Sequence, residues 1–256
     1  AALKVLAREC QGQLSETFRD EGCLTAMLEH PGVIPVHDMG VDDQGQPFLA
    51  MKLVRGVTLS ERIHALGENR LEPDSLTSLV EVHERVCDVL SYAHSQGVVH
   101  CDLKPDNIML GEFGEVYLMD WGIARRTAGP DAADAEDDDE AGHTLVGTPG
   151  FMAPEQACND EGSVGPSTDI FGLGGVLYHA LTGQPPFRAP TLMAMIYQTT
   201  LCEPTPPEEL LSDQNVEVPP ALSRIAMRAL SRRPEDRYAD ALEFKAELQR
   251  SLRVNA

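Results

Sequence analysis

Apolar side chains recur along much of this chain at steps of three and four residues, the spacing that places them on one face of a helix. The most regular pattern covers 73–96 and starts with Pro73, a residue suited to a first helical turn. It ends near Gly97, and glycine suits the left-handed residue that closes a helix. Further helices are predicted over 13–30, 58–66, 191–201, 219–230 and 240–252.

Two short runs near the N-terminus have the residue types of strands instead. They cover 33–39 and 47–54 and flank Asp42-Asp43-Gln44-Gly45, a typical turn sequence. His30-Pro31 separates the first helix from these strands, because the residue before a proline disfavours the helical conformation. Strands are therefore expected before about residue 54, and mainly helices after it.

Composition and charge narrow the class of protein. With 256 residues, 42% of them hydrophobic, the chain can bury a core as one domain or as two small lobes. The net charge of −21 repels phosphate backbones and argues against nucleic-acid binding. Seven acids and no Lys or Arg fall within 131–140. The acidity either attracts basic protein partners or serves solubility, and both interpretations stay open.

The six cysteines form no C-x-x-C pair, so neither a zinc site nor a disulfide framework is indicated. No apolar run reaches 18 residues, and no signal peptide is evident. We therefore expect a cytoplasmic location, with the alternative that the chain is the soluble part of a longer, membrane-anchored protein.

Three motifs stand in a fixed order in the middle of the chain. They are His100-Cys101-Asp102-Leu103-Lys104-Pro105-Asp106-Asn107, Met119-Asp120-Trp121-Gly122 and Gly147-Thr148-Pro149-Gly150-Phe151-Met152-Ala153-Pro154-Glu155. The first alone is weak support, but the ordered set at these separations is strong. It resembles the catalytic loop, magnesium loop and activation-segment end of Hanks-type bacterial serine/threonine protein kinases.

This resemblance implies an α+β, bilobal kinase fold over 1–256. A small β-rich N-lobe would cover 1–54 and a larger, mainly helical C-lobe 55–256. The N-lobe would be incomplete, because the chain starts at the strand that carries the ATP-contacting lysine and no glycine-rich loop precedes it. Either the chain has been cut, or the protein lacks this cover over the phosphates.

The resemblance assigns the reaction to four positions. Asp102 would accept or orient the proton of the incoming hydroxyl, and Lys104 would neutralise charge on the transferring phosphate. Asn107 and Asp120 would hold Mg²⁺ through oxygen atoms. Turn formation is the alternative for each residue alone, since Asp, Asn and Pro all favour turns.

The same resemblance places the nucleotide. Lys4 would contact the α- and β-phosphates and pair with Glu21, with Asp20 and Glu16 as competing acids on that helix. The adenine would lie among Ala2, the gatekeeper Met51, the backbone of Lys52 and Val54, and Met109 on a short strand, 108–110.

The activation segment contains two threonines of interest. Thr148 would hydrogen-bond Asp102 and Lys104 and help to seat the acceptor, by resemblance to the family. Thr144 is a candidate autophosphorylation site or an ordinary surface threonine. The Asp/Ala/Gly-rich stretch 128–142 is predicted to be a solvated insertion, with docking of basic partners as the alternative.

Two residues depart from the family pattern. Cys101 replaces the arginine that pairs with an activation-segment phosphate, so activity is expected to depend little on such phosphorylation. A redox role for Cys101 is the less favoured alternative, because a neighbouring carboxylate raises a thiol pKa. Trp121 replaces the usual phenylalanine and is expected to pack against Val36 and His100.

The C-terminal half resembles the family in two further places. Thr168 would begin a buried helix continuing to Leu181, whose Asp169 holds the backbone of the catalytic loop. Arg237 would form a buried ion pair with Glu155.

The predicted function is Mg²⁺-dependent transfer of the ATP γ-phosphate to Ser or Thr hydroxyls of protein substrates, including the chain itself. One alternative is a pseudokinase that senses nucleotide or scaffolds partners, supported by Cys101 and the missing glycine loop. The other is a small-molecule phosphotransferase, against which Lys104 and the segment 147–155 argue.

Overall fold

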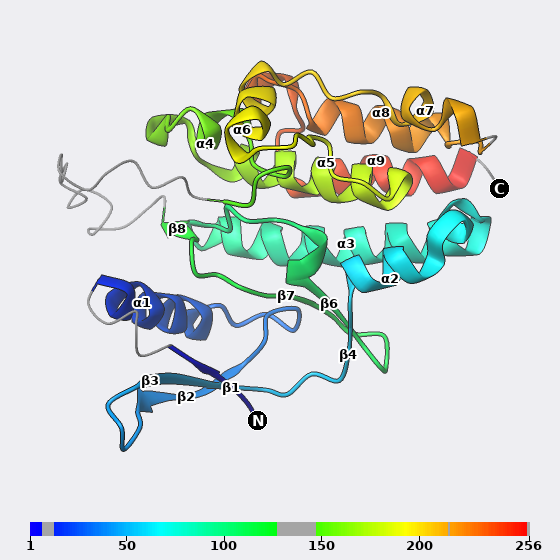
Figure 1. Ribbon diagram of the computed structural model, residues 1–256. Helices are drawn as coiled ribbons and strands as arrows, with labels where there is room; N and C mark the ends of the chain where they lie inside the picture. Colours follow the sequence, from blue (N-terminus) through cyan, green and yellow to red (C-terminus); the bar gives the residue numbers. More distant parts are fainter. Residues whose placement is uncertain (7–12, 127–146, 215, 255–256) are drawn as a thin grey trace.

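The computed structural model describes residues 1–6, 13–126, 147–214 and 216–254. Figure 1 shows a lower part made of α1 and a small sheet, and an upper part made mainly of helices. The predicted α+β, bilobal arrangement is therefore confirmed. The insertion 128–142 and Thr144 lie outside the described residues.

The lower part is built on an antiparallel sheet in the order β1-β3-β2. β1 (Ala2–Val5) pairs with β3 (Pro47–Met51), and β2 (Val36–Val41) lies on the other side of β3. The helix α1 (Gln13–Met27) packs on this sheet. Its Gly22 permits a close approach, because a Cβ there would lie only 2.8 Å from the Met39 sulfur.

Three predicted boundaries were wrong. The first helix ends at Met27 rather than at residue 30, where the chain turns and the Gly32 N–H donates to the His30 ring. The strand expected from residue 33 starts at Val36, because Val33 forms only an isolated bridge with Leu118. The strand expected over 47–54 ends at Met51, after which the chain crosses to the helical part.

The upper part begins with short elements around the predicted catalytic loop. They are β4 (Gly56–Thr58), α2 (Leu59–Leu66), the 3-10 turn η2 (Gly67–Leu71), β5 (Val98–Val99), η3 (Pro105–Asn107), β6 (Ile108–Gly111), β7 (Val116–Leu118) and β8 (Arg125–Arg126). The sheets β4-β6-β7 and β5-β8 hold the loop between them. The strand predicted at 108–110 is thus confirmed.

Long helices form the core of the upper part. They are α3 (Pro73–Ser95), α5 (Pro166–Thr182), α8 (Pro220–Ala229) and α9 (Ala241–Val254), with α6 (Leu192–Leu201) at the side. The short elements α4 (Pro154–Ala157), η5 (Glu161–Ser163), α7 (Pro207–Leu210), η6 (Ser212–Gln214) and η7 (Pro234–Asp236) connect them. The predicted helices of this half are present.

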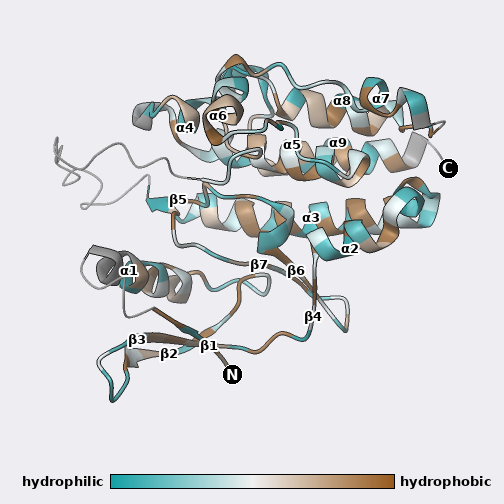
Figure 2. Cartoon of the chain, in the orientation of Figure 1, coloured by the Kyte–Doolittle hydropathy of each residue, from teal (hydrophilic) through white to brown (hydrophobic). Residues whose placement is uncertain are grey.

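α5 lies at the centre, and nearly all of its side chains are buried. Gly174 lets it approach α8 closely, since a Cβ there would lie 2.6 Å from the Cβ of Ala229. α3 covers another side of the core, and Figure 2 shows apolar and polar residues alternating along it, as the sequence periodicity predicted. Among the described residues, no helix is long and apolar enough to cross a membrane.

Candidate active site

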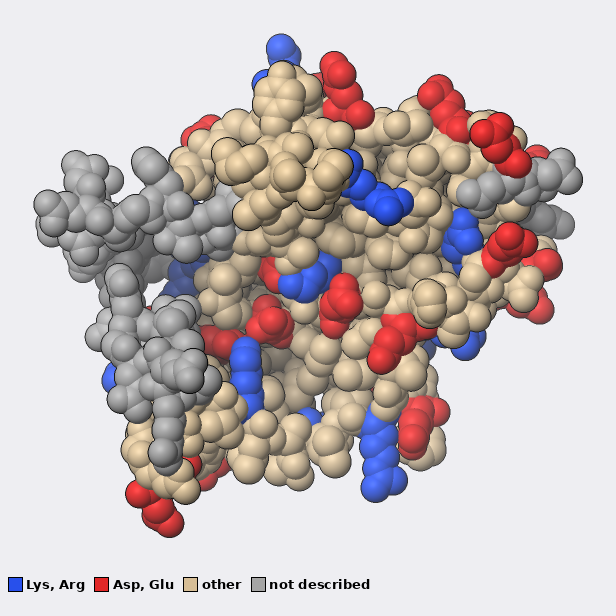
Figure 3. Space-filling model, viewed as in Figure 1, with Lys and Arg blue, Asp and Glu red and all other residues tan. Residues whose placement is uncertain are grey.

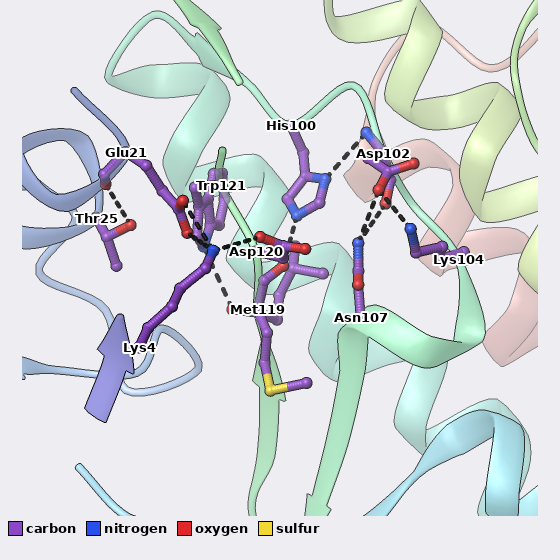
Figure 4. A network of polar contacts seen from close by, with 11 residues as sticks. Lys4, Glu21, Thr25, His100, Asp102, Lys104, Asn107, Met119, Asp120 and Trp121 are labelled. Carbon is purple, nitrogen blue, oxygen red and sulfur yellow. Dashed lines mark hydrogen bonds and ion pairs between the residues drawn. The ribbon is translucent and has the colours of Figure 1, made fainter. Parts of the chain in front are cut away.

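A lysine and two acids from three distant segments meet where the two parts face each other (Figure 4). Lys4 Nζ on β1 lies 2.6 and 2.8 Å from the two carboxylate oxygens of Glu21 on α1. The same nitrogen lies 3.1 Å from Oδ1 of Asp120, which follows β7. The predicted Lys4–Glu21 pair is therefore present, and its competitor Asp20 is exposed.

The surroundings fix both members of this pair. Glu21 is only 9% exposed. Burial alone would lower the pKa of Lys4, but the bonds to Glu21 and the charge of Asp120 outweigh it and raise the pKa above its usual value. Lys4 is thus a fixed positive charge at neutral pH, which phosphate binding requires.

A second cluster surrounds Asp102. Lys104 Nζ bonds Asp102 Oδ2 at 2.7 Å and the Thr148 hydroxyl at 2.6 Å, and that hydroxyl donates to Asp102 Oδ1 at 2.6 Å. The Asn107 amide nitrogen donates to the backbone carbonyl and to Oδ2 of Asp102, at 2.9 and 3.1 Å. The predicted contacts of Thr148 are confirmed, and the carboxylate is held in one orientation by three neighbours.

His100 and Trp121 connect the two clusters (Figure 4). His100 Nδ1 accepts from the Asp102 N–H at 3.2 Å, and Nε2 lies 2.9 Å from the carbonyl of Met119. These bonds place the ring proton on Nε2. The buried Trp121 meets His100 edge to face with ring centres 4.7 Å apart, as predicted, while its contact with Val36 stays a prediction.

Asp169 of α5 holds the backbone of the catalytic loop. One of its oxygens accepts the Cys101 N–H and the other the His100 N–H, both at 2.9 Å. His94 on α3 bonds the second oxygen at 2.8 Å. The predicted role of Asp169 in holding the loop backbone is confirmed, whereas His94 was not foreseen.

Cys101 and Asp120 are both non-glycine residues with positive φ, 66° and 61°. This conformation costs about 1–3 kcal/mol per residue and persists where surrounding bonds enforce it. The two Asp169 bonds act in this way at Cys101. Burial, reinforced by the charge of Asp169, raises the pKa of the Cys101 thiol to about 12, so a thiolate is disfavoured.

The residues predicted to contact adenine lie in two separate sheets and in the segment that connects them, and their meeting around an adenine stays a prediction. Ala2 stands opposite Met51 in the β1–β3 register, and Met109 pairs with Thr58 and Tyr117. The N–H of Lys52 is taken by the carbonyl of Pro35, so only its carbonyl could serve a purine amino group.

The Lys52 side chain makes a contact that sequence reasoning missed. Its Nζ lies 2.6 Å from the Tyr117 hydroxyl and 5.0 Å from the centre of that ring, which links the connecting segment to β7. Lys52 and Tyr117 are 65 positions apart and share no sequence motif. Predicting a hairpin over 108–118 would have been a first step toward finding this contact.

The donor set fits a magnesium nucleotide. Among the described residues, no three His, Cys, Asp or Glu side chains gather as for a protein-only metal site. Magnesium at phosphates needs only one or two protein oxygen ligands, the remainder coming from phosphates and water. The Asp120 side chain is nearly half exposed, and Asn107 bonds Asp102 through its amide nitrogen rather than its amide oxygen, so oxygens of both residues could serve.

A buried ion pair joins Arg237 to Glu155 in the segment that follows Thr148. Arg237 Nη1 and Nη2 bond the two Glu155 oxygens at 2.7 and 2.8 Å, with side-chain exposures of 0% and 4%. The predicted pair is confirmed. Because Glu155 follows Thr148 within one segment, the pair ties that segment to the helical part.

Figure 3 shows acidic and basic side chains next to one another across the middle of this face, between the two parts.

Two comparisons with known proteins agree with the arrangement of these site residues. The model of the protein kinase domain family matches residues 1–247.

Curated relatives include two mycobacterial proteins named serine/threonine-protein kinase PknB. The chain is 34% identical to that of Mycolicibacterium smegmatis and 35% identical to that of Mycobacterium tuberculosis, over 91% of this chain and 35% of the relative in both cases. It is 33% identical to serine/threonine-protein kinase PknD of Chlamydia trachomatis, over 97% of this chain and 28% of the relative. The chain thus spans about a third of these proteins. The similarities do not favour the pseudokinase alternative.

Proposed function

The chain belongs to the protein kinase domain family, and from this we propose that it transfers the γ-phosphate of ATP to Ser and Thr hydroxyls of protein substrates. Protein kinases in general use ATP with Mg²⁺. The observation that carries the proposal is the joint arrangement of Lys4, Glu21 and Asp120 beside Asp102, Lys104 and Thr148.

Positioning and charge neutralisation account for most of phosphoryl-transfer catalysis. Lys4, oriented by Glu21, holds nucleotide phosphates. Asp120 and Asn107 would hold Mg²⁺ through side-chain oxygens, and the ion would neutralise phosphate charge. Asp102 orients the acceptor hydroxyl and receives its proton, a role that its fixed carboxylate suits.

Two residues of the second cluster act on the acceptor side. Lys104 neutralises the moving phosphate, and Thr148 keeps Lys104 and Asp102 in register. The adenine lies among Ala2, Met51, Met109 and the backbone of Lys52 and Val54. We further propose that residues 1–54 form the N-lobe and 55–256 the C-lobe of one catalytic domain.

Regulation should differ from that of kinases with arginine at position 101. The Cys101 side chain is neutral and 4% exposed, so it offers no charge to an activation-segment phosphate. Autophosphorylation, for example at Thr144, is then not required for activity. Phosphatase treatment should leave most of the activity, and its loss would refute this point.

The test is transfer from γ-labelled ATP with Mg²⁺ to a generic protein acceptor, comparing the chain with Asp102→Asn. We expect transfer by the chain and loss of at least a hundredfold in the variant, in line with removal of a catalytic base. Asp106→Asn, which changes a neighbouring exposed acid, is the matched control and should retain activity. Equal rates in all three samples would refute the assignment of Asp102.

A further inference from the structure

The side chain of Gln156 joins the activation segment to the catalytic loop, and the proposed reaction has so far given it no role. It lies on α4, directly after Glu155, and is only 8% exposed. Its amide nitrogen donates to the backbone carbonyl of Cys101 at 2.7 Å, and its amide oxygen accepts the Ala153 N–H at 3.0 Å. Because a carbonyl can only accept and a backbone N–H can only donate, these partners fix which end of the amide points to the loop.

The Cys101 carbonyl belongs to the peptide group that leads into Asp102. The other end of this peptide group, the Asp102 N–H, donates to Nδ1 of His100 at 3.2 Å (Figure 4). Cys101 has a positive φ of 66°, a conformation that surrounding bonds must enforce. Asp169 holds its N–H, and Gln156 holds its carbonyl. The bond from Gln156 therefore helps to set the direction in which the Asp102 side chain leaves the backbone.

The activation segment leaves space for this amide. Gly147 has a φ of 125°, and a Cβ there would lie 3.3 Å from the amide nitrogen of Gln156 and 3.2 Å from the methyl group of Met152. A side chain at position 147 would therefore crowd the amide that bonds the loop. The next residue, Thr148, bonds Asp102 and Lys104, so two neighbouring parts of the segment contact the catalytic loop.

Capping of α4 is the alternative explanation for Gln156. Near the start of a helix, a Glu or Gln side chain commonly accepts a backbone N–H that has no helical partner, and the Gln156 oxygen does so for Ala153. A glutamate would serve this purpose equally well, because the cap needs only an acceptor oxygen. The cap does not use the donor end of the amide, and that end bonds Cys101.

We infer that Gln156 is a positioning residue for phosphate transfer, which orients Asp102 through the Cys101 carbonyl and makes this orientation depend on the seating of the activation segment. Because the side chain at position 101 is a neutral thiol, this amide provides a link between segment and loop that needs no phosphate. The inference rests on the proposed kinase function, but the effect of the bond on the loop can also be measured without transfer.

Gln156→Glu separates the two explanations, because it keeps an acceptor for the Ala153 N–H and loses the donor to the Cys101 carbonyl. At pH 8, with the generic protein acceptor, we expect kcat to fall about tenfold to a hundredfold, because displacement of a reacting group by a fraction of an ångström is costly. The KM for ATP should change less than about twofold, since the Lys4–Glu21 pair is untouched.

The pH profile of this variant is a measurement that a general packing defect would not change. The titratable and charged groups around the introduced carboxyl are Cys101, Asp102 and Asp169, which line one small cavity with it, and Glu155, which is paired with Arg237. Burial and nearby negative charges raise the pKa of a carboxyl, and the protonated form again offers a donor to the Cys101 carbonyl. The ratio of kcat in Gln156→Glu to kcat in the unsubstituted chain should therefore rise at least about fivefold from pH 9 to pH 6.

Two further variants complete the test. Gln156→Met removes both bonds without adding a titratable group, so it should lose kcat by a similar factor at every pH. Gln96→Glu makes the same chemical change at an exposed position and should keep full activity throughout. Hydrogen–deuterium exchange needs no transfer, and the backbone amides of 100–102 should exchange at least about threefold faster in Gln156→Met than in the unsubstituted chain. If Gln156→Met does not fold, Gln156→Glu at pH 9 replaces it in the exchange measurement.

A kcat ratio for Gln156→Glu that stays constant between pH 6 and pH 9 would overturn the inference, and so would unchanged kcat in Gln156→Met. Unchanged exchange of the loop amides would overturn it whether or not the chain transfers phosphate. Absence of transfer by the unsubstituted chain, with faster exchange in the variant, would instead count against the kinase function alone.

Discussion

Glu155→Gln tests the ion pair that ties the activation segment to the helical part. The substitution keeps the shape of the side chain but removes its charge. It also turns an NH₂ group toward Arg237, where both Glu155 oxygens now accept guanidinium N–H bonds and one accepts the Thr168 hydroxyl at 3.0 Å. The guanidinium would keep the carbonyls of Ser167, Ser231 and Arg232 as partners, but no compensating charge.

The exposures of 0% and 4% place this pair among buried ones. Removing one partner of such a pair costs about 3–5 kcal/mol, against a total stability of about 5–15 kcal/mol for a domain. For a chain of this size, each kcal/mol shifts the melting temperature by about 2–4 °C, so a decrease of roughly 6–20 °C is expected.

Thermal unfolding followed by circular dichroism measures this decrease. Arg237→Met and the double variant complete a thermodynamic cycle, in which the double variant should be more stable than the sum of the single effects predicts. Glu247→Gln breaks the exposed pair with Arg250 and should cost under about 1 kcal/mol. If Glu155→Gln melted as Glu247→Gln does, the energetic role given to the buried pair would be refuted.

Three further predictions concern single positions. Cys101 should resist alkylation under conditions in which exposed Cys23 reacts fully, as read by peptide mass spectrometry, because burial raises the pKa of its thiol to about 12. Lowering the pH from 7.5 to 5 should reduce the free energy of unfolding of the chain by about 2 kcal/mol more than it reduces that of the His83→Leu variant, as measured by urea titration. Burial lowers the pKa of His83 to about 4, so the unfolded chain binds a proton in this range that the folded chain does not, and stability falls as the pH falls. Gly122→Ala should lower kcat/KM by roughly tenfold to a hundredfold, because its Cβ would lie 3.0 Å from Glu21 Oε2 and displace that carboxylate from the lysine.

Each of these has a matched control. Exposed Cys158 should react as fast as Cys23, and rapid labelling of Cys101 in the folded chain would contradict its burial. His37→Leu, on the surface, should keep the pH dependence that His83→Leu loses. Gly165→Ala meets nothing within 4 Å and should keep full activity, whereas unchanged kinetics in Gly122→Ala would show that the Glu21 position is not critical.

Local patterns were enough to predict the elements whose residues interact with their own neighbours. α3 was predicted from its apolar period and its Pro73 start, and it spans Pro73–Ser95. The end of α1 was misplaced because a bond from the Gly32 N–H to the His30 ring stabilises a turn there. Apolar spacing alone does not reveal a bond of this kind.

The candidate site shows the same difference between residues within motifs and contacts between distant residues. Positions inside the motifs could be assigned, and their contacts to Glu21, Asp169 and Glu155 followed from the family resemblance. His94 and the Lys52–Tyr117 contact could not be assigned, because they join residues 75 and 65 positions apart and belong to no motif.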